Sequence, residues 1–226
     1  MWLVASSEID DLAVVRDGKP ALWRELRRFN APIQLAVAAA HEVVAHAAAP
    51  AEAALVSLAP CESGSPELHA WVHDIVLERT TKINPTYTLH AVDNLALSVL
   101  SIALQNHGWS MGLGGGMFFS ALEIVLERDE HEVIVLAGDQ INGAIESPAA
   151  GVALLFSRER RPYVATGRPT RLDRIERQRM SFNYYYGNAT WALGDIVEAL
   201  RTAPAGALAV PGHDGYGDAI VHLEVE

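Results

Sequence analysis

Cysteine is almost absent from this chain, because Cys61 is the single one in 226 residues. One cysteine excludes disulfide bonds within the chain and a zinc site made of several cysteines. The first residues lack a basic segment and soon reach Glu8, Asp10 and Asp11, a pattern that does not fit a signal peptide. No apolar run approaches the length that crosses a bilayer, so we expect a cytoplasmic protein without a membrane span.

Positive charge is also scarce. The chain has 17 lysines and arginines against 28 acidic residues, which gives a formal net charge of −11. Such a chain repels nucleic acid, and it disfavours an acidic protein partner unless its basic residues cluster. Basic residues do cluster in one segment, which fits either a solvated surface or a docking patch for an acidic partner. The arginines of this segment are Arg158, Arg160, Arg161, Arg168, Arg171, Arg174, Arg177 and Arg179.

The sequence lacks the spacing of a metal or nucleotide site. His41 and His46 are one residue too far apart for the His-Glu-x-x-His pattern, so their imidazoles would not share a helix face. His69 and His73 have helical spacing, but no third ligand follows at an evident interval. The dinucleotide fingerprint and the P-loop lysine are missing too. We therefore expect no metal and no cofactor.

The composition of the chain predicts a single hydrophobic core. Half of its residues are hydrophobic, which predicts one domain over residues 1–226. Apolar spacing within 21–49 predicts a helix with Asn30 as its cap and Pro32 in its first turn. Other helices are expected at 66–79, 94–106, 116–128 and 189–202, and strands at 53–58, near 111, and at 133–137, 151–156 and 219–225. This alternation predicts an α/β fold with a mixed sheet of about five strands flanked by helices.

Short motifs between residues 83 and 140 resemble those of a known family. Asn84-Pro85-Thr86-Tyr87 is followed by Ala91-Val92-Asp93-Asn94, an apolar helix pattern, and a strand that ends in Gly138-Asp139. This order resembles the amino-terminal half of the thiolase fold in β-ketoacyl synthases, and more closely the short chain-length-factor-like proteins. The family pattern has Ser and His where this chain has Ala91 and Asp93. The resemblance is clearest over 22–140 and implies a layered α-β-α half-thiolase, with 150–226 completing the sheet.

The resemblance also implies where a catalytic nucleophile would lie. In active synthases a cysteine begins the helix after the glycine-containing strand, where the helix N-terminus lowers the thiol pKa and backbone N–H groups stabilise an oxyanion. The corresponding residues 112–120 contain no cysteine. Cys61 belongs to an earlier element and adjoins Glu62, which would raise the pKa of its thiol. The catalytic histidines lie in a second, homologous half that this chain is too short to contain.

We therefore predict a non-catalytic, chain-length-factor-like accessory subunit in fatty-acid-like, type II polyketide or aryl-polyene-type biosynthesis. The resemblance implies a ketoacyl synthase or an acyl carrier protein as partner, and a homodimer or heterodimer formed through the strand at 110–114. Apolar side chains there would complete the dimer surface or limit the partner's acyl tunnel. The expected acyl-binding or interface residues are Asn94, Ser110, Met111, Leu113, Gly114, Gly115, Gly116, Met117, Phe118 and Phe119.

Two alternatives remain open on the sequence. One is a small thioester-acting enzyme, a hydrolase, cyclase or acyltransferase, that uses Ser110, Ser120 or Cys61. A serine nucleophile needs an adjacent base, and His107 lies three residues before Ser110. The other is a binding protein for an acyl group or an aromatic acid. Its pocket would adjoin the run from Gly114 to Gly116, which is either a close-packed turn or a former oxyanion turn.

Overall fold

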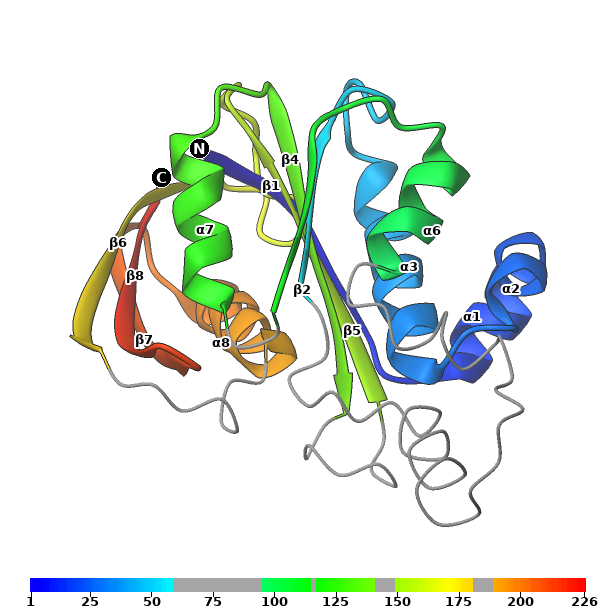
Figure 1. The fold of residues 1–226 in the computed structure, drawn as a ribbon. Coiled ribbons are helices and arrows are strands. Elements are labelled where there is room, and N and C mark those ends of the chain that lie inside the picture. Colours follow the sequence, from blue (N-terminus) through cyan, green and yellow to red (C-terminus); the bar gives the residue numbers. More distant parts are fainter. Residues whose placement is uncertain (59–94, 115–116, 141–148, 181–188) are drawn as a thin grey trace, which may run out of the picture.

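Eight strands form one mixed sheet in the computed structural model, which describes residues 1–58, 95–114, 117–140, 149–180 and 189–226 (Figure 1). Their order across the sheet is β3-β2-β4-β5-β1-β6-β8-β7. The strands are β1 Trp2–Ile9, β2 Ala54–Leu58, β3 Ser110–Leu113, β4 Glu132–Gln140, β5 Ala149–Ser157, β6 Thr170–Met180, β7 Gly206–Asp214 and β8 Gly217–Val225.

The predicted α/β class with a mixed sheet is confirmed, but the predicted count of about five strands is too low. Strand β2 runs parallel to β3 and β4, whereas β5 is antiparallel to β4 and β1. Strands β6, β8 and β7 then extend the same sheet through antiparallel pairs. Strands β1, β6 and β7 were not predicted, and the second half of the arginine-rich segment, from Arg171 to Arg179, lies in strand β6.

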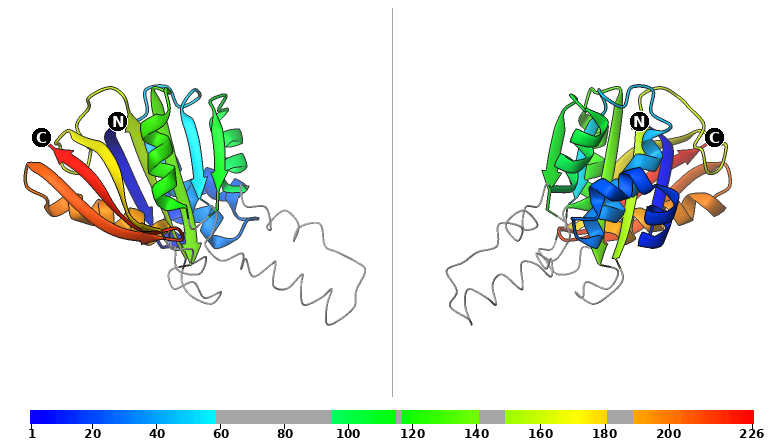
Figure 2. Two further views of the ribbon diagram at one scale, coloured as in Figure 1. Left: turned by 60° about the vertical axis from the view of Figure 1, so that its left-hand side comes forward. Right: turned by 90° about the vertical axis from the view of Figure 1, so that its right-hand side faces the viewer.

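Helices cover both faces of the sheet (Figures 1 and 2). Helices α3 and α6, with α1 and α2 beside them, lie on one face, and α7 and α8 lie in the hollow of the other, curved face. The described helices are α1 Leu12–Gly18, α2 Pro20–Leu26, α3 Ala31–Val44, α6 Leu95–Leu104, α7 Phe118–Glu127 and α8 Ala189–Thr202. The helix expected at 66–79 lies outside the described residues. None of the described helices has the length and hydrophobicity of a membrane span.

Helix α3 begins where its sequence predicts. The side chain of Asn30 caps it by accepting a hydrogen bond from the Ile33 N–H at 3.2 Å, and Pro32 lies in the first turn. An asparagine cap satisfies one of the N–H groups that a helix start leaves free, and proline there loses no intrahelical bond. The helical spacing before this cap belongs to a separate helix, α2, which ends at Leu26.

Strands β4 and β5, at the centre of the sheet, are buried on both faces, so their sequences are almost continuously apolar. In β4, Val133, Val135 and Ala137 face α7 and α8, whereas Ile134 and Leu136 face α3 and α6. Alternate residues of a strand point to opposite faces, which explains how one strand supplies both cores. Strand β2 pairs with β4 on one side and with β3 on the other, so the buried centre of the sheet positions β3.

Two paired glycines let α3 approach the sheet closely. Gly138 of β4 lies opposite Gly151 of β5 in the antiparallel register. A Cβ atom at Gly138 would lie 2.1 Å from the Pro32 carbonyl oxygen, and one at Gly151 would lie 2.1 Å from the Leu35 carbonyl carbon. Real Cβ atoms do not approach backbone so closely, so both positions require glycine for packing.

Glu132 is a buried carboxylate at the start of β4. It accepts hydrogen bonds from the N–H groups of Ala48 at 2.9 Å and Ala49 at 3.0 Å, and it forms an ion pair with Arg161. Burial alone would raise the pKa of this carboxyl, but the backbone N–H donors and the guanidinium outweigh it, and the net pKa is lowered. Glu132 therefore ties the α3–β2 connection to the segment after β5.

We expect Glu132→Gln to destabilise the protein by about 2 kcal/mol or more at neutral pH, because it removes a charged acceptor and leaves Arg161 without its ion-pair partner. The lowered folded-state pKa makes the contribution complete above the unfolded value of about 4.3, and lost as pH falls through the folded value. Urea unfolding at several pH values checks this: the deficit should shrink below about pH 4. Glu127→Gln, at an exposed carboxylate on α7, is the control; an equal deficit in both variants would contradict the assignment.

Candidate functional site

The predicted site lies where β3 leaves the sheet and α7 begins. Strand β3 pairs in parallel with β2 on one side, and on its other side no strand among the described residues pairs with it. Ser110, Met111 and Gly112 are exposed, with Met111 at 37%, whereas Leu113 is partly buried against the α7 and α8 core. An edge strand with an exposed apolar side chain can pair with another chain.

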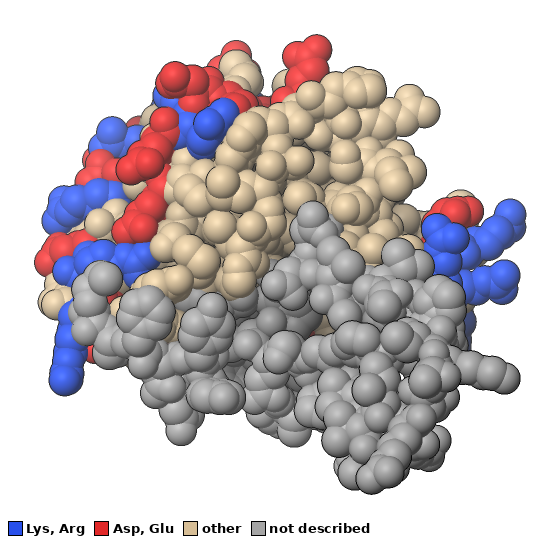
Figure 3. Space-filling model, viewed as in Figure 1, with Lys and Arg blue, Asp and Glu red and all other residues tan. Residues whose placement is uncertain are grey.

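A wide uncharged surface surrounds this edge. Residues 95–122 contain no aspartate, glutamate, lysine or arginine, although 20% of the chain is charged. Helix α6 exposes Ile102 at 79%, together with Ser98 and Ala103. Figure 3 shows this face as a broad area over α6 and α7, with charged side chains gathered on either side of it. Depletion of charge around exposed apolar residues is typical of the core of a protein interface.

The N-terminus of α7 is capped from a distant part of the chain. Met117, the cap residue by position, makes no side-chain hydrogen bond to the helix. Instead, Asp214 Oδ2 accepts a hydrogen bond from the Phe119 N–H at 3.0 Å, across a separation of 95 residues. Asp214 is 1% exposed, and its Oδ1 accepts from the Tyr216 N–H at 2.8 Å. The turn between β7 and β8 thus places a carboxylate at the start of α7.

Arg177 of β6 completes this cluster. Its guanidinium donates to both carboxylate oxygens of Glu123, at 2.9 and 3.0 Å, and to Ser120 Oγ at 3.0 Å. It also lies 3.3 Å from Asp214 Oδ2. The hydrogen bonds to Glu123 raise the pKa of Arg177 against the effect of burial, and Asp214 raises it further. Arg177 therefore joins β6, α7 and the β7–β8 turn.

The structure divides the predicted site residues into two sets. Phe118 and Phe119 are 1% exposed, with ring centroids 5.0 Å apart, and belong to the core of the chain itself. A Cβ atom at Gly212 of β7 would lie 2.7 Å from the Phe119 ring, so this ring packs directly on the hairpin. The second set, Ser110 and Met111, is exposed on β3. After this strand, the Met117 N–H donates a 3.0 Å hydrogen bond to the Gly114 carbonyl. Acyl binding by any of these residues stays a prediction.

Some predicted residues lie outside the described part of the chain, namely Asn94, Gly115, Gly116 and Cys61. Of the two serines, Ser120 accepts its hydrogen bond from Arg177, which cannot act as a base. Ser110 is exposed, and no hydrogen bond joins it to His107. Within the ranges that the structure describes, neither serine has the adjacent base that activates a hydroxyl.

The arginine-rich segment has partners within the chain for most of its members. Arg160 pairs with Glu226, Arg171 with Glu224, and Arg174 with Asp173 and Glu176 on the outer face of the sheet. Arg158, Arg161 and Arg177 pair with Asp129, Glu132 and Glu123, and Arg168 donates to the Ala203 carbonyl at 2.6 Å. Exposed Arg179 has no partner among the described residues. A docking role for the segment stays a prediction.

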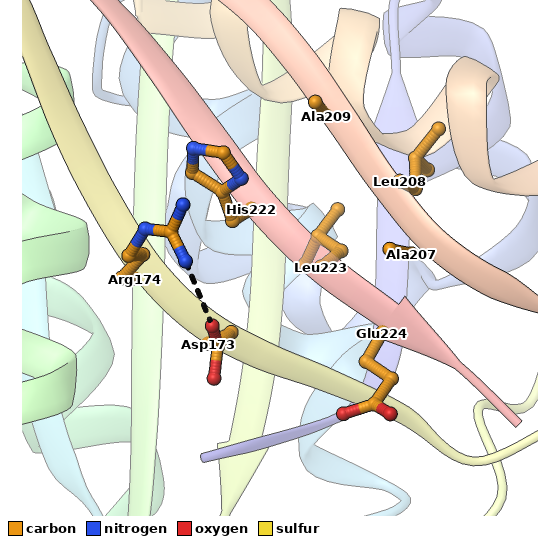
Figure 4. Close-up of a pocket in the computed structure, with 8 residues that line it drawn as sticks. All are labelled: Asp173, Arg174, Ala207, Leu208, Ala209, His222, Leu223 and Glu224. Atoms are coloured by element: carbon orange, nitrogen blue, oxygen red, sulfur yellow. Dashed lines mark ion pairs between the residues drawn. The ribbon is translucent and has the colours of Figure 1, made fainter.

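A separate groove of about 370 Å³ opens on the outer face of β6, β8 and β7 (Figure 4). Asp173 and Arg174 form an ion pair along its wall. His222 is held by Glu176 at 2.9 Å, and Glu224 pairs with Arg171, so the charged groups are already engaged. The remaining lining residues are Ala207, Leu208, Ala209 and Leu223. Among the described residues, no group of three potential ligands could hold a metal ion.

Asp214 and Arg177 were not predicted as site residues. The one signal available is Asp214-Gly215, a dipeptide typical of tight hairpin turns, which could have located the β7–β8 turn. Nothing in the sequence relates that turn to Phe119.

Comparisons with known proteins support the fold. No protein-family model matches the sequence, and no curated protein matches it. Among solved structures, the ketosynthase ApeO in complex with its chain length factor ApeC from Xenorhabdus doucetiae is similar at 17% identity and a TM-score of 0.55, over 88% of this chain and 79% of that one. The ishigamide ketosynthase/chain length factor is similar at 10% identity and a TM-score of 0.57, over 93% and 84%. The chain therefore has the fold of these ketosynthase and chain length factor structures, as its motifs predicted.

Proposed function

We propose that this chain is a non-catalytic accessory subunit that pairs with a ketoacyl synthase, in the manner of a chain length factor, in fatty-acid-like, type II polyketide or aryl-polyene-type biosynthesis. One observation carries the proposal. The chain has the ketosynthase-like fold, but the helix start that would carry the nucleophile has no cysteine and is capped by the buried carboxylate of Asp214.

The missing thiol removes the first step of condensation. A ketoacyl synthase takes its acyl group onto a thiolate, which attacks the carbonyl carbon of an acyl thioester and releases the thiol of the donor. That attack requires a nucleophile at the helix N-terminus and free N–H groups for the carbonyl oxygen. In this chain the Phe119 N–H is already bonded to Asp214, and Ser120 has no base beside it among the described residues. The chain would therefore support condensation only through a partner.

The unpaired edge of β3 is the proposed contact with that partner. Its exposed Met111 and the surrounding uncharged surface of 95–122 fit an apolar protein interface. In this arrangement Leu113 and Met117 border the interface, and Phe118 and Phe119 form a rigid apolar wall behind it. Such a wall would limit the depth of an acyl tunnel that ends at the interface.

An acidic acyl carrier protein is expected to dock on the ketoacyl synthase rather than on this chain. The chain carries a net charge of −11, and most arginines of its basic segment are paired with its own carboxylates. Like charges disfavour encounter, so direct affinity for an acidic carrier protein would be weak.

Intact-mass analysis with a panel of acyl thioesters tests the proposal that the chain is non-catalytic. We expect no acyl adduct and no thioester turnover from the purified chain with any donor, because no serine in the described part of the chain has an activating base. A stable adduct that maps to Cys61, Ser110 or Ser120 would overturn the proposal in favour of a thioester-acting enzyme. An active cysteine-dependent ketosynthase, acylated by the same donors, is the positive control.

A further inference from the structure

Helix α7 begins with N–H groups that have no carbonyl partner within the helix, as every helix does. Phe118 is its first residue and Phe119 its second, so the Phe119 N–H is one of these free donors. A side chain at the cap position normally accepts from the second or third N–H. Met117 has no suitable oxygen, and the bond to Asp214 takes its place.

Three groups of the chain bind the carboxylate of Asp214. The Phe119 and Tyr216 N–H groups bond to its two oxygens, at 3.0 and 2.8 Å, and Arg177 lies 3.3 Å away. A negative charge at a helix N-terminus is stabilised by the helix dipole and by these donors. These contacts therefore fix the position of the buried Asp214 carboxylate at the start of α7.

We infer that Asp214 replaces the nucleophile: its buried carboxylate occupies the position at the α7 N-terminus where a ketosynthase would hold its thiolate. The comparison with a thiolate rests on the proposed function. The capping of α7 by Asp214 rests on the hydrogen bond from the Phe119 N–H alone. Asp214 is a positioning residue, and it leaves no free N–H at the second helical position for an acyl carbonyl.

The start of α7 therefore differs from a ketosynthase site in two ways: it lacks a cysteine, and its Phe119 N–H is bonded to Asp214. A cysteine placed at Met117 would have its preferred donor, the Phe119 N–H, already taken, and would lie close to a like charge. Its thiol should therefore be unreactive. Removing the charge of Asp214 removes the anion that offsets the helix dipole, so the pKa of such a thiol should fall.

The test uses Met117→Cys in a Cys61→Ser background, with the pH dependence of iodoacetamide alkylation as the readout. We expect an ordinary or raised thiol pKa, at or above about 8.5, and about tenfold faster alkylation near pH 7 after Asp214→Asn is added. Asp218→Asn, which removes an exposed carboxylate of the same hairpin, is the matched control and should change the rate little. Equal alkylation rates in the Asp214→Asn and Asp218→Asn variants would overturn the inference.

A second measurement uses the unmodified chain, so it holds even where Asp214→Asn fails to fold. Amide hydrogen exchange of Phe119 should be slowed by at least about 100-fold relative to a free peptide, although a second-position helical N–H has no partner within its own helix. Exchange as fast as in an exposed helix start would contradict the cap. Both measurements are made on the isolated chain, so they stand apart from whether a ketoacyl synthase binds it.

Discussion

Replacing Gly151 with valine should abolish the native fold. The new Cβ atom would lie 2.1 Å from the Leu35 carbonyl carbon and 2.3 Å from the Ala36 nitrogen. Both are backbone atoms of α3, a helix packed against β4, β5 and β1, so no flexible side chain can move aside. Overpacking of this kind exceeds the usual cost of about 1–3 kcal/mol because the helix itself must shift. Circular dichroism and urea unfolding measure the loss.

Gly18→Ala is the matched control, since a Cβ atom there meets nothing within 4 Å. We expect that variant to unfold at nearly the same urea concentration as the unmodified chain. A stable, cooperatively folding Gly151→Val variant would show that α3 does not lie against β5 as described.

Replacing Leu113 with aspartate should weaken the proposed association with a ketoacyl synthase by at least about 100-fold, because it buries an unpaired charge. Met111→Asp should act in the same direction. Met111 is exposed in the isolated chain, so its replacement leaves the chain's own core intact. Affinity is measured by calorimetry or surface plasmon resonance with the ketoacyl synthase of the same host.

Val164→Asp supplies the control for this experiment. Val164 is a large exposed apolar residue, 54% accessible, in the connection between β5 and β6 and away from β3. We expect unchanged affinity in that variant. Thermal unfolding of each variant separates a lost interface from a lost fold, and unchanged affinity in both Met111→Asp and Leu113→Asp would show that β3 is not the contact.

Elements with strong local signals were predicted well from the sequence. Helix α8 was expected at 189–202 and is observed as Ala189–Thr202. The start of α3 followed from Asn30 and Pro32, because a cap residue and a first-turn proline act locally. Strands β4 and β5 were recognised since strands buried on both faces are almost wholly apolar.

Strands β6 and β7 were not predicted, because their sequences fit a strand only when the neighbouring strands are known. Strand β6 reads as a run of charges, but Arg171 and Arg174 lie on the outer face and pair with carboxylates of β8 or of β6 itself. Strand β7 contains Pro211, which is tolerated because β7 lies at the edge of the sheet. In both cases the neighbouring strand decides the structure, and local composition does not reveal it.

The candidate site was predicted only in its local part. Strand β3 and helix α7 were predicted from glycines and an apolar helix pattern. The resemblance to ketosynthases placed the candidate site between them, and that placement stays a prediction. The bond from Phe119 to Asp214 joins residues 95 positions apart, and Arg177 reaches the same cluster from β6. Such contacts depend on how the sheet curves around α7, which no local pattern encodes.

The most direct test of the account is to tag the protein at its chromosomal locus, purify it gently from its own host, and identify its companions by quantitative mass spectrometry. The proposed function predicts a ketoacyl synthase at near-stoichiometric amount. A homogeneous oligomer of this chain alone, with no ketoacyl synthase above background, would contradict it.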